Sequence, residues 1–501
     1  MSGYYVENFG CRATQADGGA LERQFEERGL ARASTPGQAA VVVLNTCTVT
    51  AAADQDARAA IRRIQRQNPE ARIVVTGCYA QRAPEEIAAL PGVSCVIGNS
   101  HKHQLAEIAL QGSTAVAPAG TFVPLSELSS FRRRPTSDDQ AAIFVSDIFA
   151  HTELLAAPVF DAAGDGEEGG RTRPNLKIQD GCDNRCSFCV IPYVRGQSRS
   201  LETDRILGEV KALVEAGYRE VVLSGINLGR WGRDLDSGLQ ASAGSGLRAS
   251  GCRQNTDGFP KPEAGSPKPT FVALIGAILE ETALEKLRLS SIEPMDWCDE
   301  LIALVASSGR IAKHAHVPMQ SGSDAVLRRM HRKYRPWHYR EKIEKIHETM
   351  PSAAIGADVM VGFPGESEAD FEATRRMVED LPFTYLHVFT YSPRPGTPAA
   401  GMAKQVPVHV ARERNRILRE LAAGKKLEFM RSFIGKEIEA ITLRSQGRAG
   451  ESPAPTQFTE ALTDNYLKLH LKGRHEANRW LRARVEDVVG GTLVGSEAVW
   501  Q

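Results

Sequence analysis

The chain lacks the segments that would place a protein in or across a membrane. Residues 1–10 contain no cationic and apolar signal sequence, and no apolar run is long enough to span a bilayer. Net charge is also absent, because 61 Lys and Arg balance 61 Asp and Glu. The missing signal sequence and membrane span predict a cytoplasmic protein, in which cysteines are more often metal ligands or catalytic groups than disulfides. A chain of 501 residues is too long for one core and implies about three domains.

Basic residues are nevertheless concentrated in two segments. Residues 328–345 carry eight Lys and Arg against two Glu, and residues 404–448 carry eleven against five. A run of like charges commonly marks only the solvated face of a helix. Two such runs in one chain also favour contact with a nucleic acid, because phosphates attract clustered cations.

Cysteine is present nine times, and three of these residues are closely spaced. Cys182, Cys186 and Cys189 form a C-x3-C-x2-C motif directly after the strand-like run Leu176–Gln179. A structural zinc site needs four ligands, usually as two C-x2-C pairs or cysteine with histidine, and no second pair lies nearby in the sequence. Three thiolates are one fewer than a closed four-iron cubane takes. The motif therefore predicts an iron–sulfur cluster with one iron left open.

The first hundred residues alternate strand-like and helix-like segments, which predicts a parallel sheet. Each strand leads into a cysteine, namely Cys11, Cys47 or Cys78. Because parallel strands end at one edge of the sheet, these thiols are candidates for a shared metal site. Their separations form no motif, however, so the residues alone leave open that they are core thiols. Cys95 lies inside an apolar run and is predicted to be a core thiol.

A second strand–helix series begins at Leu176, and its six repeats predict a partial parallel barrel with the active site at the carboxyl ends of the strands. A Gly-, Ser- and Pro-rich insertion interrupts the series, so Cys252 within it is an unlikely ligand. Short β-prone runs at the end of the chain predict a small all-β module. The expected organisation is an α/β domain at 1–125, a linker at 126–173, a barrel at 174–403 with an insertion at 231–270, a basic helical connector at 404–431 and an all-β domain at 432–501.

These features resemble the methylthiotransferase family of radical S-adenosylmethionine (SAM) enzymes over nearly the whole chain. The C-x3-C-x2-C loop resembles the motif whose open iron chelates SAM in that superfamily. The segments NTCTVT at 45–50 and TGCYAQ at 76–81 resemble the family's N-terminal motifs. The resemblance implies a second [4Fe-4S] cluster on Cys11, Cys47 and Cys78, and an RNA-binding C-terminal β-barrel called TRAM. One departure is Thr14, where family members usually carry Asn.

Substrate branches of this family modify isopentenyladenosine in tRNA, threonylcarbamoyladenosine in tRNA, or an aspartate of a ribosomal protein. The segment SSIEP at 290–294 resembles the threonylcarbamoyladenosine branch, and LHVF at 386–389 favours the same branch. The resemblance thus implies methylthio transfer to C2 of N6-threonylcarbamoyladenosine at position 37. That carbon is an unactivated aromatic C–H centre, for which a cofactor must carry the difficult step. A non-catalytic, metal-containing RNA-binding protein is the alternative from another class.

The predicted barrel mouth offers polar and aromatic groups for SAM. These candidates end the second, third and fourth barrel strands or lie within the cysteine loop, although a carboxylate there also suits an exposed surface and an aromatic group also suits local packing. They are Phe188, Ser224, Gly225, Ser291, Glu293 and Gln320. The expected partners are the anticodon stem-loop of tRNA, whose single-stranded bases can be splayed out, and an electron donor such as flavodoxin or ferredoxin. No membrane partner is expected.

Overall fold

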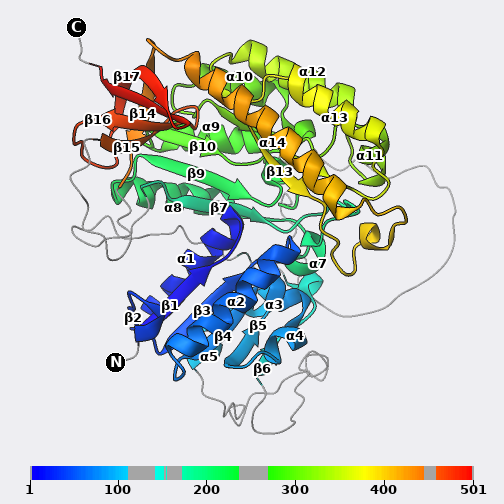
Figure 1. The fold of residues 1–501 in the computed structure, drawn as a ribbon. Helices are drawn as coiled ribbons and strands as arrows, with labels where there is room; N and C mark the ends of the chain where they lie inside the picture. Colours follow the sequence, from blue (N-terminus) through cyan, green and yellow to red (C-terminus); the bar gives the residue numbers. More distant parts are fainter. Residues whose placement is uncertain are drawn as a thin grey trace, which may run out of the picture.

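The computed structural model describes residues 3–110, 141–151, 154, 172–235, 269–444 and 458–498. An N-terminal sheet domain lies below a larger central domain, and a small C-terminal barrel packs at one end of the latter (Figure 1). Among the described residues, no helix is both long enough and apolar enough to cross a membrane. The predicted mixed α/β architecture is confirmed.

The N-terminal domain is a six-stranded parallel sheet in the order β2-β1-β3-β4-β5-β6. Its central strands are fully buried because helices cover both faces, which explains their continuous Val and Ile runs. The strands are β1 (Gly3–Asn8), β2 (Ala31–Arg32), β3 (Val41–Thr46), β4 (Arg72–Gly77), β5 (Val93–Ile97) and β6 (Ala142–Phe144). The helices are α1 (Arg12–Glu26), α2 (Ala51–Gln67), α3 (Cys78–Arg82), α4 (Pro84–Ala88) and α5 (Leu105–Leu110).

The central domain is an open barrel made of two sheets. One sheet has the order β10-β9-β7-β8, the other β11-β12-β13, and single bridges such as Ser291 to His316 join β10 to β11. All six predicted strands are present, as β7 (Asn175–Asp180), β9 (Glu220–Gly225), β10 (Lys286–Leu289), β11 (His314–His316), β12 (Ala354–Val361) and β13 (Tyr385–Thr390), with the short antiparallel β8 (Arg199–Ser200) added at the edge.

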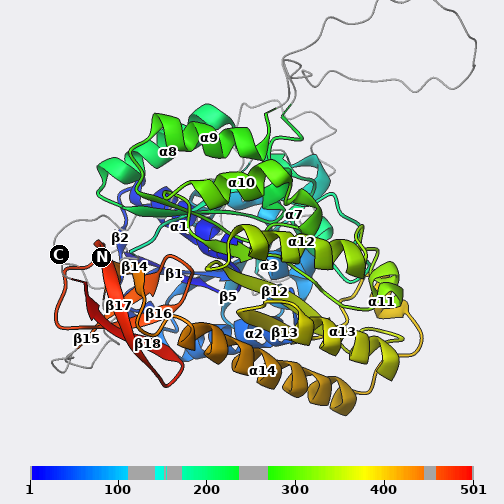
Figure 2. The same ribbon diagram turned by 90° about the horizontal axis from the view of Figure 1, so that it is seen from above.

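Helices surround the outer face of this open barrel (Figure 2). Apolar side chains on that face pack against the helices and form the largest core of the molecule, whereas the inward-facing positions of the strands are largely polar. This division leaves a polar barrel interior available for chemistry. The helices are α7 (Ile191–Arg195), α8 (Thr203–Glu215), α9 (Phe271–Glu281), α10 (Asp299–Ser307), α11 (Asp324–Arg329), α12 (Pro336–Thr349) and α13 (Glu368–Asp380).

The long helix α14 (Val408–Arg431) crosses the central domain and leads into the C-terminal barrel (Figure 1). That barrel is closed, in the order β14-β15-β16-β18-β17. Alternate residues of its strands face an apolar interior, as expected of a small barrel. The strands are β14 (Glu437–Thr442), β15 (Phe458–Thr463), β16 (Lys468–Lys472), β17 (Trp480–Val489) and β18 (Thr492–Glu497).

Two of the elements that the sequence did not predict are β6 and α10. Within the expected linker, β6 pairs with β5 and extends the N-terminal sheet, because the apolar Ile143 and Phe144 pack against that domain's two cores. Helix α10 was not predicted; its buried face includes Leu301, Ile302 and Val305. Most of the expected insertion, including Cys252, lies outside the described residues.

Candidate active site

The three N-terminal cysteines lie at one edge of the parallel sheet. Cys11 precedes α1, Cys47 follows β3, and Cys78 opens α3 directly after β4. Gly10, at φ +103°, lies so close to Cys47 that a Cβ on this glycine would be 2.9 Å from the Cys47 Sγ atom. Burial, and then the neighbouring Cys78 and Cys11 thiolates, raise the pKa of Cys47 to about 12. The structure thus brings these three residues together. That they hold a [4Fe-4S] cluster remains a prediction.

Polar groups surround this N-terminal trio. The Asn99 amide approaches the Cys78 Sγ atom at 3.7 Å, and the Thr14 hydroxyl lies 3.6 Å from the Cys11 Sγ atom. Thr14 is fully buried and also accepts from Arg195 at 3.5 Å. The residue that departs from the family pattern therefore still links the first cysteine to the central domain.

The barrel trio lies in the loop between β7 and α7. The Cys182 amide donates to the Gly196 carbonyl at 3.1 Å, which closes the base of the loop. The Cys182 Sγ atom accepts from the Asn184 amide at 3.4 Å and lies 3.7 Å from the Asn227 side-chain nitrogen. Burial, followed by the nearby Cys186 and Cys182 thiolates, raises the pKa of Cys189 to about 12. All three thiols therefore face one small volume.

Arg332 is the main cation beside the barrel trio. Its guanidinium donates to the Cys186 Sγ atom at 3.3 Å and pairs with the Glu293 carboxylate. It is buried, lying 4.9 Å from the Tyr334 ring centroid. An N–H donor of this kind stabilises negative charge on a cluster ligand. Because Glu293 is paired with Arg332, its carboxylate is not a free surface group. The same pairing limits how far Glu293 can bind the hydroxyls of a ribose.

Helix α7 connects the two trios. Cys189 is followed by Val190, which packs with Val194 directly against Cys78 of the N-terminal domain. The same Asn99 that approaches Cys78 donates to the Val194 carbonyl at 2.7 Å. The loop that carries the barrel trio is therefore anchored on the third cysteine of the N-terminal trio. As a result, Val190 and Val194, which follow the barrel trio in the chain, pack directly on a cysteine of the other trio.

Five buried charges lie beside this layer and join the two domains. Asp17 of α1 pairs with Lys102, Lys177 and Arg195, and Asp180 pairs with Lys177 and Arg195. Each of these residues is at most 6% exposed. Buried charges of this kind are tolerated only when fully paired. Although burial opposes it, the attraction of the Lys102, Lys177 and Arg195 cations lowers the pKa of Asp17.

The donor chemistry at both sites fits an iron–sulfur cluster. Each site presents three cysteines without a disulfide partner, and N–H groups point at sulfur atoms in both. Cluster potentials respond to such hydrogen bonds and to solvent exposure. Cys95, by contrast, is fully buried among apolar side chains in β5, as a core thiol would be.

Five of the six predicted SAM contacts fall into two groups, and the sixth, Glu293, is paired with Arg332. Four surround the carboxyl ends of the barrel strands: the buried Ser224 hydroxyl has no hydrogen-bond partner among the described residues, Gly225 packs on Gln179, Ser291 bridges to β11, and Gln320 has a left-handed backbone at φ +59°. Phe188, in contrast, packs in an apolar cluster with Phe363, at a centroid distance of 6.4 Å. That contact supports the local-packing alternative for Phe188. The contacts of all six with SAM stay predictions.

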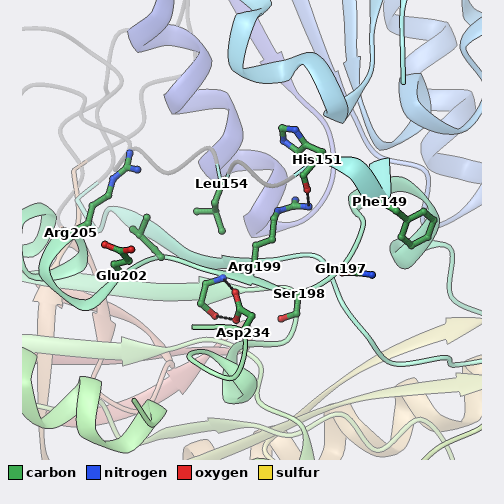
Figure 3. Close-up of a pocket in the computed structure, with 11 residues that line it drawn as sticks. Phe149, His151, Leu154, Gln197, Ser198, Arg199, Glu202, Arg205 and Asp234 are labelled. Atoms are coloured by element: carbon green, nitrogen blue, oxygen red, sulfur yellow. Dashed lines mark hydrogen bonds between the residues drawn. The ribbon is translucent and has the colours of Figure 1, made fainter. Parts of the chain in front are cut away.

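A polar cleft of about 560 Å³ lies beside β8 (Figure 3). Arg199, Arg205, Glu202 and Asp234 line it, and Asp234 accepts from the Ser200 hydroxyl and amide. The lining residues that the structure describes include none of the six cysteines. The cleft is therefore distinct from the two thiol sites.

Sequence reasoning missed the groups that surround the cysteines. Arg332 was counted only as part of a basic run, and Asn99, Asn227 and Arg195 carry no motif signal. They come from separate elements that only the fold brings together. A polar site residue can be recognised from the sequence when it lies next to a cysteine motif. A site residue that comes from a remote part of the chain cannot be recognised in this way.

Two family models match the chain. Residues 3–98 match the Uncharacterized protein family UPF0004, and residues 176–378 match the Radical SAM superfamily. The second match covers the strand–helix series that carries the barrel trio. The protein is therefore a radical SAM enzyme, and this class implies SAM and a [4Fe-4S] cluster as cofactors.

Full-length relatives narrow the class. The threonylcarbamoyladenosine tRNA methylthiotransferase MtaB of Aquifex aeolicus is 34% identical over 479 residues, covering 96% of this chain and 99% of that protein. The Bacillus subtilis protein of the same name is 34% identical, covering 95% and 92%. A tRNA-2-methylthio-N(6)-dimethylallyladenosine synthase of Thermobifida fusca is 32% identical, covering 89% and 78%. The chain thus belongs to the methylthiotransferase family of radical SAM enzymes, as its cysteine motifs predicted.

Proposed function

We propose that this enzyme adds a methylthio group to C2 of N6-threonylcarbamoyladenosine at position 37 of tRNA. The observation that carries the proposal is the pair of three-cysteine sites whose segments contact each other where Val190 and Val194 pack on Cys78. One site then serves radical generation and the other sulfur supply. The names of the relatives at 34% identity support this substrate over the isopentenyl alternative.

Cys182, Cys186 and Cys189 would hold the cluster that binds SAM, and Cys11, Cys47 and Cys78 would hold a second [4Fe-4S] cluster. When bound, the first supplies the electron for reductive SAM cleavage, and the second supplies a site for the transferred sulfur. Arg332 and Asn227 stabilise sulfur charge at the first site. Asn99 does so at the second and also fixes the relative position of the two.

The polar ends of the barrel strands would orient SAM. Ser224 offers a buried hydroxyl that has no hydrogen-bond partner among the described residues, and Gly225, which lacks a side chain, lies beside Gln179 at the end of the same strand. Gln320 and Ser291 lie on the neighbouring strand ends. The partners would be the anticodon stem-loop of tRNA in the cytoplasm and an electron donor such as flavodoxin or ferredoxin. An unpaired loop base is the expected target, since it can leave its stack at modest cost.

The direct test uses protein reconstituted anaerobically with iron and sulfide. It is incubated with SAM, reductant and tRNA that carries either threonylcarbamoyladenosine or isopentenyladenosine, followed by mass spectrometry of the nucleosides. The expected result is the 2-methylthio derivative of threonylcarbamoyladenosine, with deoxyadenosine as co-product. Methylthio product only on isopentenyladenosine would replace the proposed substrate. Absence of deoxyadenosine from a cluster-loaded protein would contradict the catalytic role.

A further inference from the structure

The inner face of the second barrel sheet carries a row of polar side chains. His316 of β11, Asp358 of β12 and His387 of β13 lie at adjacent levels, because His316 pairs in register with Gly356 and Asp358 pairs with His387. Strand residues two apart share a face, so Asp358 lies beside His316 on the interior side. One potential ligand atom from each of the three lies within 4.8 Å of the others.

Two of these side chains are held in fixed positions. The His316 Nε2 atom lies 3.2 Å from an Asp358 carboxylate oxygen, and its Nδ1 atom lies 3.0 Å from the Tyr385 hydroxyl. Tyr385 in turn lies 2.7 Å from the His314 Nε2 atom. Both nitrogens of His316 are therefore engaged, and its role is to orient Asp358. Gly356 makes the arrangement possible, since a Cβ there would collide with the Tyr385 ring at 2.0 Å.

His387 is different, because it is exposed and makes no hydrogen bond with the part of the chain that the structure describes. Its ring lies between those of Tyr385 and Phe389, at centroid distances of 5.3 Å and 6.5 Å. The side chain of Asp358 is 29% exposed, so it also remains accessible. The row thus presents a hydrogen-bonding imidazole next to a carboxylate acceptor.

Contacts connect the row with the segments that carry both thiol sites. On β12, Asp358 precedes by two residues Met360, which packs in the same cluster as Phe188 of the barrel trio. On the other side, the Tyr385 ring that contacts His387 lies 6.1 Å from the Tyr466 ring, and Arg12, which directly follows Cys11, donates to the Tyr466 hydroxyl at 2.9 Å. A base presented to both sites would therefore place its substituents near this row.

We propose that Asp358 and His387 form the subsite for the N6 substituent of the target base, and that this subsite selects a ureido carboxylic acid. The inference rests on the proposed function and adds the residues that choose the substrate. The N–H groups of the threonylcarbamoyl group donate to Asp358, and its carboxylate or hydroxyl accepts from His387. Nearby Arg12 favours the carboxylate electrostatically.

An isopentenyl group offers neither donor nor acceptor. Its binding would remove water from Asp358 and His387 without replacing the lost hydrogen bonds. A site built around hydrogen bonds rejects an analogue that lacks the partner groups far more strongly than an apolar pocket rejects an added polar group. The subsite therefore discriminates between the two tRNA substrates of this family.

The test compares His387→Phe and Asp358→Asn with wild-type enzyme. Phenylalanine keeps the ring packing of His387 but cannot hydrogen-bond, and His409→Phe on the exposed surface of α14 is the matched control. For each variant, kcat/KM and stem-loop affinity are measured with threonylcarbamoyl- and isopentenyl-bearing RNA. Iron content and circular dichroism report on folding and cluster loading.

The expected result is a fall of about 10- to 100-fold in kcat/KM on threonylcarbamoyl RNA, the usual effect of losing a hydrogen bond to a charged group. The preference for threonylcarbamoyl RNA over isopentenyl RNA should fall as well, both in kcat/KM and in binding affinity. The His409→Phe control should change neither preference. Unchanged preference in both variants would overturn the subsite. So would a stoichiometric non-cluster metal that is lost in Asp358→Asn, since the three side chains would then be metal ligands. A wild-type enzyme inactive on threonylcarbamoyl RNA would instead refute the proposed function, and this inference with it.

Discussion

The two cysteine trios offer similar ligands, but the chain assembles them in different ways. The barrel trio lies within eight consecutive residues of one loop, and its geometry is set by local hydrogen bonds such as Cys182 to Gly196. The N-terminal trio is distributed over 68 residues and is assembled by the order β1-β3-β4 of a parallel sheet. The first site therefore depends on loop structure, whereas the second depends on the integrity of a whole domain.

Loss of the barrel trio is expected to have the largest effect. Replacing Cys182, Cys186 and Cys189 with Ala removes every thiolate for the SAM-binding cluster. Deoxyadenosine formation should be abolished, and iron should fall by about four atoms per chain while the other cluster remains. Product analysis by chromatography and iron determination check this. Normal deoxyadenosine production by the triple variant would show that these cysteines do not generate the radical.

Loss of the N-terminal trio should separate the two functions. With Cys11, Cys47 and Cys78 replaced by Ala, SAM cleavage should remain detectable because the barrel has its own core. Methylthio transfer should stop, because the site for sulfur is gone. Nucleoside mass spectrometry of tRNA and deoxyadenosine assays on one preparation check both. Methylthio product at the normal rate would identify the trio as core thiols.

The same contrast explains how much the sequence predicted. Spacing alone predicted the barrel trio, because its ligands are local, and alternating apolar segments predicted all six barrel strands. The parallel strand ends made Cys11, Cys47 and Cys78 candidates for one site, but predicting a cluster there needed a family resemblance, since their spacing depends on helix and loop lengths that carry no chemical signal. Arg332 and His387 were not predicted as site residues, because their positions depend on how remote strand ends and loops meet.

The buried charges between the domains offer an intermediate test. Replacing Arg195 with Met removes one of the two cations that Asp17 and Asp180 share, the other being Lys177, from a buried network. Breaking a buried pair in this way typically costs about 3–5 kcal/mol. The free energy of unfolding in urea should fall accordingly. As a control, Arg416→Met on the exposed face of α14 removes a surface pair to Glu413 and Glu420 and should change little. Equal stabilities of the two variants would refute the structural role of the network.

The C-terminal barrel is bound to the central domain more closely than its sequence suggests. The buried Arg288 donates to the Asp464 carbonyl at 2.9 Å, Lys286 pairs with Glu439, and Asn465 donates to the Ser352 carbonyl at 3.0 Å. Removing residues 432–501 would therefore leave Arg288 with unsatisfied donors and damage the central domain. Surface substitutions are the cleaner way to test RNA binding by this barrel.

Exposed cations of the C-terminal barrel should have the smallest effect. Lys468, Arg474 and Arg484 point to solvent, and phosphate contacts supply salt-dependent affinity that is largely independent of sequence. Each Ala substitution should weaken tRNA binding a few-fold without altering the preference for threonylcarbamoyladenosine. The slope of log affinity against log salt should fall by about 0.7 to 0.9 for each lost contact. Binding titrations at two or more salt concentrations measure this, with Lys211→Ala on α8 as a control outside the barrel. An unchanged slope in the triple variant would mean that these cations do not contact the RNA, and that the small barrel serves only to close the central domain.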